Sequence, residues 1–279
     1  MRRPMYPEPM SQLAVWSGRL AWFALAVTLL SIVVLRSGLL EAEPALATFA
    51  AALIFAALAV LLAFLSFIPI WRLGRSGLGR AVLGLFLGLL LLAYPGYLAY
   101  RGSKLPAITD ITTDTVHPPR FDLLARLRPR GRNDYPGAQT AALQRAAYPD
   151  IAPLDESVAP AIAFRAALAV VDKRKWLIVD ARPPAPPRRD GVIEAVARTF
   201  IMGFRDDVVV RVSAEDGGAR IDVRSASRIG VSDLGTNAAR VRALLADIDD
   251  AIGELPAEPR PEPAKKPAPK RPQKKPPRR

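Results

Sequence analysis

Three long apolar runs fill most of the first hundred residues of the chain, at 13–35, 45–70 and 81–100. A helix of about 20 apolar residues crosses a hydrocarbon core of roughly 30 Å, so each run is long enough to span a membrane. Arg19 is the only charged residue within the runs, and it lies close enough to one end to reach the headgroups. A cleaved signal peptide is the alternative for the first run, but such a peptide has a shorter apolar stretch. The pattern predicts three transmembrane helices within residues 1–105.

The direction of these helices follows from the arginines that flank them, because cytoplasmic loops of membrane proteins are enriched in Lys and Arg. The first loop carries only Arg36, whereas Arg101 and Lys104 follow the third run and favour the opposite direction. The N-terminus and the second loop together carry five arginines: Arg2, Arg3, Arg72, Arg75 and Arg80. The balance predicts a multi-pass protein of the cell inner membrane, with a cytoplasmic N-terminus and a periplasmic C-terminal domain.

Two glycines four residues apart, Gly84 and Gly88, lie in the third apolar run. This spacing lets the backbones of two membrane helices approach closely. Packing against the first two spans and dimerisation with a second copy are both consistent with it.

The pattern changes after residue 157, where short periodic segments replace the long apolar runs. A helical stripe covers 161–173, and a strand is predicted at 176–182. Two β-rich runs and a returning strand at 219–227 follow, and a last amphipathic helix covers about 235–253. This order predicts an α+β domain over 106–255, with an antiparallel sheet of about four strands and helices on one face.

The register of the last hairpin can be predicted from charge. With Asp216 and Gly217 as the turn, Arg211 lies opposite Asp222, and Val212 and Val210 face Ile221 and Val223 on the other side of the sheet. A turn shifted by one residue would place Arg211 opposite another arginine, Arg224. The first register is therefore favoured.

The segment between the third run and the domain lacks sustained periodicity and is rich in Pro, Thr, Asp and Arg. Its stretch 110–121, DITTDTVHPPRF, predicts a strand or hook laid on the domain. His117 within it is the only histidine, and the chain has no cysteine. These counts exclude a histidine cluster, a thiolate metal site and a disulfide, so we expect no metal and no cofactor.

The formal net charge of +13 is unevenly distributed. Residues 1–105 hold 9 Lys/Arg against 3 Asp/Glu, and residues 256–279 hold 9 against 2, whereas the middle of the chain is neutral. This distribution favours a membrane surface over nucleic acid as the partner. The tail 256–279 has 9 prolines and no large apolar side chain, which predicts disorder. It is either a spacer or an attachment to anionic lipid or cell-wall polymer.

The densest polar stretch is DVRSASRIGVSDLGTNAAR, residues 222–240. The predicted register places Asp206 near Ser227 and Asp207 near Ala226, beside the arginines of the returning strand. The candidate ligand-binding residues are Arg224, Ser225, Ser227, Arg228, Ser232, Asn237 and Arg240. Three interpretations remain open: a structural ion network, a site for a small anion or anionic headgroup at the start of the last helix, and a hydrolase or transferase using Asp206 or Asp207.

The sequence of this region, with the motifs FRDD at 204–207 and RSASRIGVSDLGTNAAR at 224–240, resembles the sequences of the family numbered 1499 among the domains of unknown function. The resemblance covers roughly residues 109–255. It implies a bacterial envelope or membrane protein and supports the domain boundary, but it implies no established activity. A structural envelope scaffold without a ligand therefore remains an alternative. The residues that match the family's motif are Phe204, Arg205, Asp206, Asp207, Arg224, Ser225, Ser227, Arg228, Gly230, Ser232, Asp233, Gly235, Asn237 and Arg240.

Overall fold

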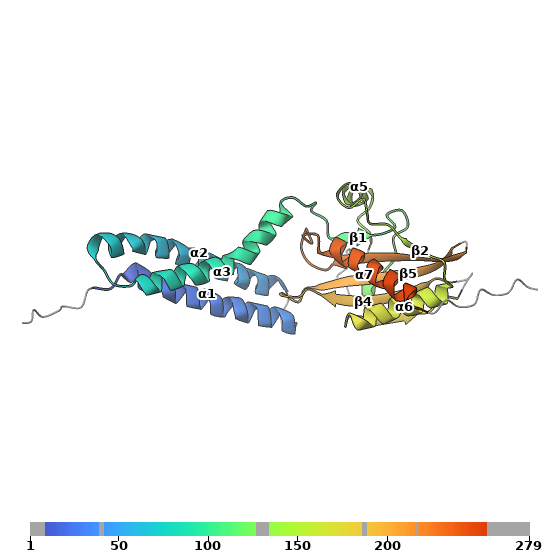
Figure 1. The fold of residues 1–279 in the computed structure, drawn as a ribbon, viewed down its shortest axis with the longest axis horizontal. Coiled ribbons are helices and arrows are strands. Elements are labelled where there is room, and N and C mark those ends of the chain that lie inside the picture. Colours follow the sequence, from blue (N-terminus) through green and yellow to red (C-terminus); the bar gives the residue numbers. More distant parts are fainter. Residues whose placement is uncertain (1–8, 39–41, 127–133, 186–188, 216, 256–279) are drawn as a thin grey trace, which may run out of the picture.

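The structure is a computed structural model that describes residues 9–38, 42–126, 134–185, 189–215 and 217–255. A helical bundle and an α+β domain follow one another along its long axis (Figure 1). The predicted disordered tail, 256–279, lies outside the described residues.

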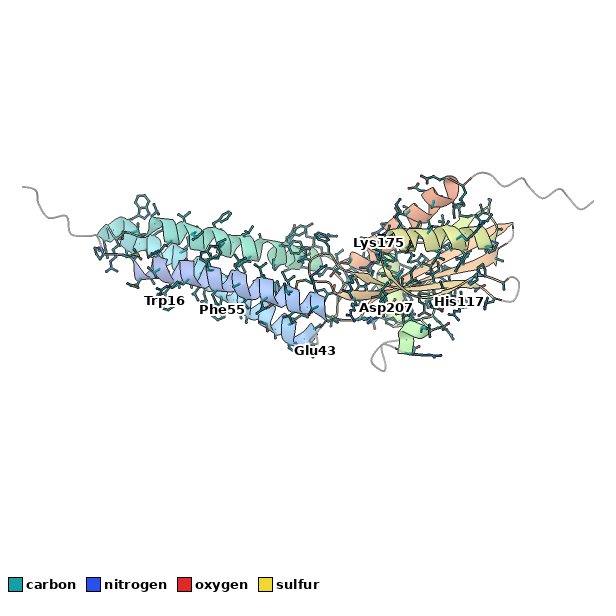
Figure 2. The ribbon with its side chains drawn as sticks, turned by 90° about the horizontal axis from the view of Figure 1, so that it is seen from below. Trp16, Glu43, Phe55, His117, Lys175 and Asp207 are labelled. Atoms are coloured by element: carbon teal, nitrogen blue, oxygen red, sulfur yellow. The ribbon has the colours of Figure 1, made fainter. Side chains whose placement is uncertain are left out.

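The bundle consists of α1 (Gln12–Ser37), α2 (Ala42–Leu73) and α3 (Leu78–Gly102). All three helices are long and apolar enough to cross a membrane, which confirms the predicted run of three long apolar helices. The bundle buries small side chains and exposes large ones: Ala21 and Ala56 are fully buried, whereas Trp22 and Phe64 are more than half exposed. This distribution is typical of helices that pack against each other in lipid. Figure 2 shows Trp16 toward the far end of the bundle and Glu43 at the end beside the domain.

The two glycines of α3 pack inside the bundle. A Cβ atom on Gly84 would lie 2.0 Å from Ser17 Oγ of α1, and one on Gly88 would lie 2.6 Å from Val60 Cγ2 of α2. The close spacing therefore serves packing within the chain, the first of the two alternatives that the sequence left open.

The second half of α3 leaves the bundle. The buried residues of α3 end at Gly88, and Pro95 interrupts the helix seven residues later. Proline inside a helix removes a backbone hydrogen bond and favours a kink. Figure 1 shows the last turns of α3 diverging from α2 as they approach the domain.

The sheet of the domain is antiparallel and has six strands. These are β1 (Asp110–Thr112), β2 (Leu154–Glu156), β3 (Leu177–Arg182), β4 (Gly191–Arg198), β5 (Arg205–Glu215) and β6 (Gly218–Ser227). Their order is β1-β6-β5-β4-β3, and β2 also pairs with β6. The prediction of about four strands covered β3 to β6. β1 lies within the stretch 110–121, for which a strand or hook was predicted, whereas β2 was not predicted, because three residues are too few for an alternating pattern to appear in the sequence.

The helices of the domain are α4 (Leu123–Arg126), α5 (Ala138–Ala147), α6 (Pro160–Lys173) and α7 (Thr236–Gly253). The main core lies between the sheet and the pair α6 and α7, with Val171, Val210 and Leu244 fully buried in it. This arrangement confirms the predicted α+β sandwich. The opposite face carries a smaller apolar cluster in which Leu124 of α4 packs near Val209.

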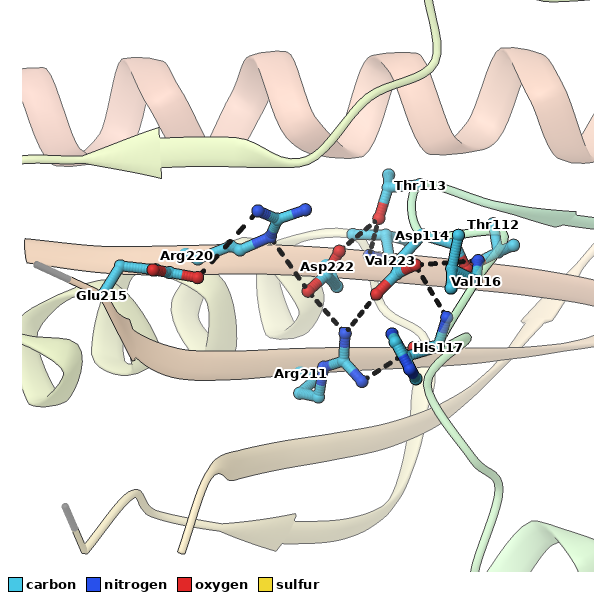
Figure 3. A network of polar contacts seen from close by, with 10 residues as sticks. All are labelled: Thr112, Thr113, Asp114, Val116, His117, Arg211, Glu215, Arg220, Asp222 and Val223. Carbon is cyan, nitrogen blue, oxygen red and sulfur yellow. Dashed lines mark hydrogen bonds and ion pairs between the residues drawn. The ribbon is translucent and has the colours of Figure 1, made fainter. Parts of the chain in front are cut away.

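The predicted hairpin register is confirmed. Val212 pairs with Ile221, and Arg211 pairs with Asp222, to which its guanidinium donates a hydrogen bond of 2.7 Å. Figure 3 shows how this pair extends to the segment after β1: Arg211 also donates to Asp114 at 3.1 Å and to the carbonyl oxygen of His117 at 2.9 Å. The predicted hook at 110–121 is therefore fastened to the outer face of the hairpin.

Candidate functional site

The sheet divides the predicted site residues between its two faces. Neighbouring residues of a strand point to opposite sides, so Asp206 and Asp207 cannot face the same space. Asp206 is bonded to Arg240 of α7, whereas Asp207 is bonded to Arg228. The α7 side holds Asp206, Ser225, Ser227, Asn237 and Arg240.

Asn237 is the centre of the network on the α7 side. Its amide nitrogen donates to the carbonyl oxygen of Thr109 and to Ser227 Oγ, both at 2.9 Å, and its oxygen accepts from Ser225 Oγ at 2.7 Å. Arg240 joins this network and forms an ion pair of 2.6 Å with Asp206. Because these side chains satisfy one another in a buried setting, the network fastens α7 to the sheet.

Arg224 and Arg228 lie on the opposite face. Arg224 donates to both oxygens of Asp110 at 2.9 and 2.7 Å, and its guanidinium lies 4.7 Å from the ring centre of Phe121. Arg228 donates to Asp207 at 2.9 and 2.6 Å. The Arg224 side chain is 1% exposed and that of Arg228 is 19% exposed. These pairs join β1 and β5 to β6, which is a structural role.

The geometry weakens the catalytic interpretation. General acid–base work by two carboxylates requires them to share one space, where one can stay protonated. Asp206 and Asp207 are separated by the sheet, and each is paired with its own arginine. Among the described residues, moreover, no group of three or more His, Cys, Asp or Glu side chains is arranged to hold a metal ion.

The start of α7 is capped by a carboxylate. Asp233 accepts hydrogen bonds from the backbone N–H groups of Gly235 at 2.9 Å and of Asn237 at 2.8 Å. Burial raises the pKa of Asp233 above its usual value, although these two N–H groups oppose the shift. An anion site on the first N–H groups of α7, as the sequence suggested, is therefore already filled by the chain itself.

A cavity of about 880 Å³, which we call the membrane-side cavity, lies where the domain meets the bundle. Leu46 of α2 and Leu98 of α3 contribute apolar side chains to its wall. The remaining lining residues come from the facing ends of β4, β5 and β6 with the loops β4–β5 and β6–α7, from the α6–β3 connection, and from α3 and α7. Its five arginines are Arg101, Arg174, Arg198, Arg205 and Arg240.

Two of these five arginines form ion pairs with carboxylates of the described residues, and three do not. Arg174 forms an ion pair with Asp247, and Arg240 forms one with Asp206. Within the part of the chain that the structure describes, no carboxylate lies within ion-pair distance of Arg101, Arg198 or Arg205.

Arg198 and Arg205 also oppose each other directly. They are register partners at the end of the β4–β5 ladder, and like charges in this position repel. The Arg205 guanidinium reaches the C-terminal end of α1, where a Cβ on Gly38 would lie 2.8 Å from its Nη2 atom. The partial negative charge of a helix C-terminus offsets some of this repulsion.

Some of the candidate site residues from the sequence line this cavity and others do not. Asp206, Ser227, Ser232 and Arg240 line it, whereas Asp207, Arg224, Ser225, Arg228 and Asn237 are not among its lining residues. The prediction omitted Arg101, Arg174, Arg198 and Arg205. The sequence contained one indication for two of these arginines: Arg198 and Arg205 stand directly before and after the apolar segment TFIMGF, residues 199–204.

Comparisons with known proteins add a family to this description. No curated protein matches the chain. One solved structure, "Crystal structure of Ara h 8.0201", is 12% identical over 37% of this chain and 95% of its own, with a TM-score of 0.23, which is too low to support an argument. Residues 110–248 match the model described as "Protein of unknown function (DUF1499)". The C-terminal half of the chain is thus a DUF1499 domain, as its motif predicted.

Proposed function

We propose that this protein is a multi-pass membrane protein whose DUF1499 domain binds an anionic group in the membrane-side cavity. One observation carries the proposal: Arg198 lies opposite Arg205 in the wall of a cavity that also contains Arg101, with no carboxylate of the described residues paired to any of the three. A bound anion would replace the repulsion between these guanidinium groups with charge-assisted hydrogen bonds.

The composition of the cavity suits the headgroup of a membrane amphiphile as well as a free anion. Guanidinium groups bind phosphate and carboxylate in a planar, bidentate geometry. The apolar side chains of Leu46 and Leu98, from two candidate membrane spans, can accommodate hydrocarbon beside the charged group. A polar group beside apolar walls is the usual composition of a small-molecule site.

A binding experiment tests this proposal and separates the two sources of the anion. The full chain is reconstituted in nanodiscs of neutral phosphatidylcholine, with or without phosphatidylglycerol, and unfolded by heat with and without inorganic phosphate. A ligand at 100 times its dissociation constant stabilises the folded state by about 2.7 kcal/mol. Stabilisation by phosphate indicates a free anion, and stabilisation only by phosphatidylglycerol indicates a lipid headgroup.

Charge-removing variants assign the effect to the cavity. Arg198→Gln/Arg205→Gln removes the opposed pair, and the anion effect should be lost. The matched control is Arg145→Gln/Arg165→Gln, which removes two exposed arginines from α5 and α6, away from the cavity wall. No anion effect in the unmodified protein, or equal effects in both double variants, would overturn the proposal in favour of a scaffold without a ligand.

We place the domain on the periplasmic side of the inner membrane, with the N-terminus in the cytoplasm. The support is the excess of arginines in the N-terminal segment and in the loop between α2 and α3. Alkaline phosphatase fused after Leu255 should then be active in intact cells. A fusion active only as a cytoplasmic reporter would reverse the orientation.

In the periplasmic orientation the basic tail 256–279 faces anionic lipid or cell-wall polymer, and each basic residue near such a surface contributes about 1 kcal/mol of binding free energy.

A further inference from the structure

The loop between β4 and β5, residues 199–204, is an apolar hairpin end with the sequence TFIMGF; we call it the β4–β5 tip. Phe200 is 94% exposed and Ile201 is 37% exposed. Hairpin ends that face water are usually built from Gly, Asn, Asp, Pro and Ser. An exposed phenylalanine at the end of a hairpin therefore requires an explanation other than turn formation.

The backbone of the tip is closed without help from these apolar side chains. The Thr199 N–H donates to the Phe204 carbonyl oxygen at 2.9 Å, and the Gly203 N–H donates to the Thr199 carbonyl oxygen at 3.0 Å. Thr199 Oγ1 accepts a third bond from the Phe204 N–H at 2.9 Å. Gly203 adopts the left-handed conformation, φ +72°, that lets the chain turn. The tip is thus an ordered turn that presents Phe200 away from the domain.

A contact with α1 and a shared cavity wall place the tip beside the helical bundle. Arg36, in the last turn of α1, donates through Nη1 to the carbonyl oxygens of Phe200 at 2.5 Å and Ile201 at 3.3 Å. The tip also shares the wall of the membrane-side cavity with Leu46 of α2 and Tyr94 of α3. Arg36 and Leu46 lie near the ends of their candidate membrane spans, and Tyr94 lies in the second half of its span, so the tip lies beside the domain-side ends of the spans.

Aromatic residues mark the same level as a membrane interface. Tyr94, Tyr97 and Tyr100 of α3 are all about half exposed or more, and the Lys104 ammonium lies 4.4 Å from the ring centre of Tyr100. Tyrosines are enriched where a span meets the headgroups. Phe200 therefore lies in a part of the molecule that has the composition of a membrane interface.

We propose that the β4–β5 tip inserts into the lipid interface, so that the DUF1499 domain contacts the bilayer directly and not only through the chain that connects it to α3. Phe200 and Ile201 contact the acyl-chain boundary, and Arg198 and Arg205 at the base of the hairpin lie at the level of the lipid phosphates. The bilayer is favoured over a protein partner because α1, which the tip contacts, is itself a candidate span.

The absence of cysteine from the sequence makes this inference directly testable. Phe200→Cys is labelled with the environment-sensitive fluorophore NBD in the full chain, in nanodiscs of phosphatidylcholine without added anions. The matched control is Val116→Cys, an apolar residue of the same domain that is 74% exposed and lies in the loop fastened to Arg211.

At position 200 we expect blue-shifted emission, quenching by lipids with a nitroxide on the acyl chain, and protection from aqueous iodide. At position 116 we expect the reverse. Ile201→Cys provides a second site in the tip if the first variant does not fold. A label at 200 or 201 that behaves like the label at 116 in nanodiscs would overturn insertion. If such a label is protected in native membranes but not in nanodiscs, a protein partner and not the lipid covers the tip, and insertion is overturned as well. Neutral lipid keeps this result separate from anion binding in the membrane-side cavity.

Discussion

The buried ion pair between Arg224 and Asp110 is the contact whose removal should destabilise the domain most clearly. The two side chains are 1% and 6% exposed, and they form two hydrogen bonds of 2.9 and 2.7 Å. Arg224→Ala leaves the Asp110 carboxylate buried without its partner. It also removes a bond of 3.1 Å to the carbonyl oxygen of Pro119 and the contact with the Phe121 ring.

The expected cost follows from this burial. Breaking a buried ion pair by removing one partner costs about 3–5 kcal/mol, because an uncompensated charge remains. A typical domain is stable by about 5–15 kcal/mol, so the variant should lose a large share of its stability. Arg242→Ala is the matched control. Arg242 also pairs with an aspartate, Asp150, but the two side chains are 42% and 55% exposed, and an exposed pair contributes about 0–1 kcal/mol.

Urea unfolding of the full chain, followed by the fluorescence of Trp176, measures both variants. Trp176 is the only tryptophan after residue 105, so replacing Trp16, Trp22 and Trp71 by Phe makes the signal specific for the domain. Asp110→Asn/Arg224→Gln should be more stable than Arg224→Ala, because it buries no charge. An Arg224→Ala variant within about 1 kcal/mol of Arg242→Ala would refute the buried-pair argument.

Three further changes test other parts of the structure. For Asp114, burial alone would raise the pKa, but hydrogen bonds from the His117 and Val116 N–H groups and from Arg211 hold it below its ordinary value. The wild type should therefore have a larger unfolding free energy than Asp114→Asn near neutral pH, and urea titrations should show this difference disappearing as the pH falls through the lowered pKa. Asn237→Ala should lower the unfolding free energy by about 3 kcal/mol in the same assay, because it leaves buried groups such as the Thr109 carbonyl oxygen without a hydrogen-bond partner. A loss of less than about 1 kcal/mol would contradict the central place of Asn237 in the network on the α7 side. Gly84→Ala should lower the melting temperature of the bundle in detergent, since its Cβ would lie 2.0 Å from Ser17 Oγ and 2.9 Å from the Ser17 backbone, whereas Gly96→Ala meets nothing within 4 Å and should leave it unchanged.

The membrane helices and the β5–β6 hairpin were predictable because their signals are local. A run of about 20 apolar residues indicates a span without reference to the rest of the chain. The pairing of Arg211 with Asp222 follows from a turn only a few residues away, and the structure has the same pair. The alternation along β5 was equally readable, and it alone places the neighbours Asp206 and Asp207 on opposite faces.

The partners of the polar residues were decided by the tertiary structure. Arg224 and Asp110 are 114 residues apart, and they meet because the three-residue strand β1 joins the edge of β6. The membrane-side cavity combines Leu46, Arg101 and Arg198 from segments on both sides of the linker. Periodicity specifies which face a side chain takes within its own element, but the element that covers that face depends on the packing of the whole chain. Spans and register therefore followed from the sequence, whereas the arginine-lined cavity existed only once the bundle and the sheet were brought together.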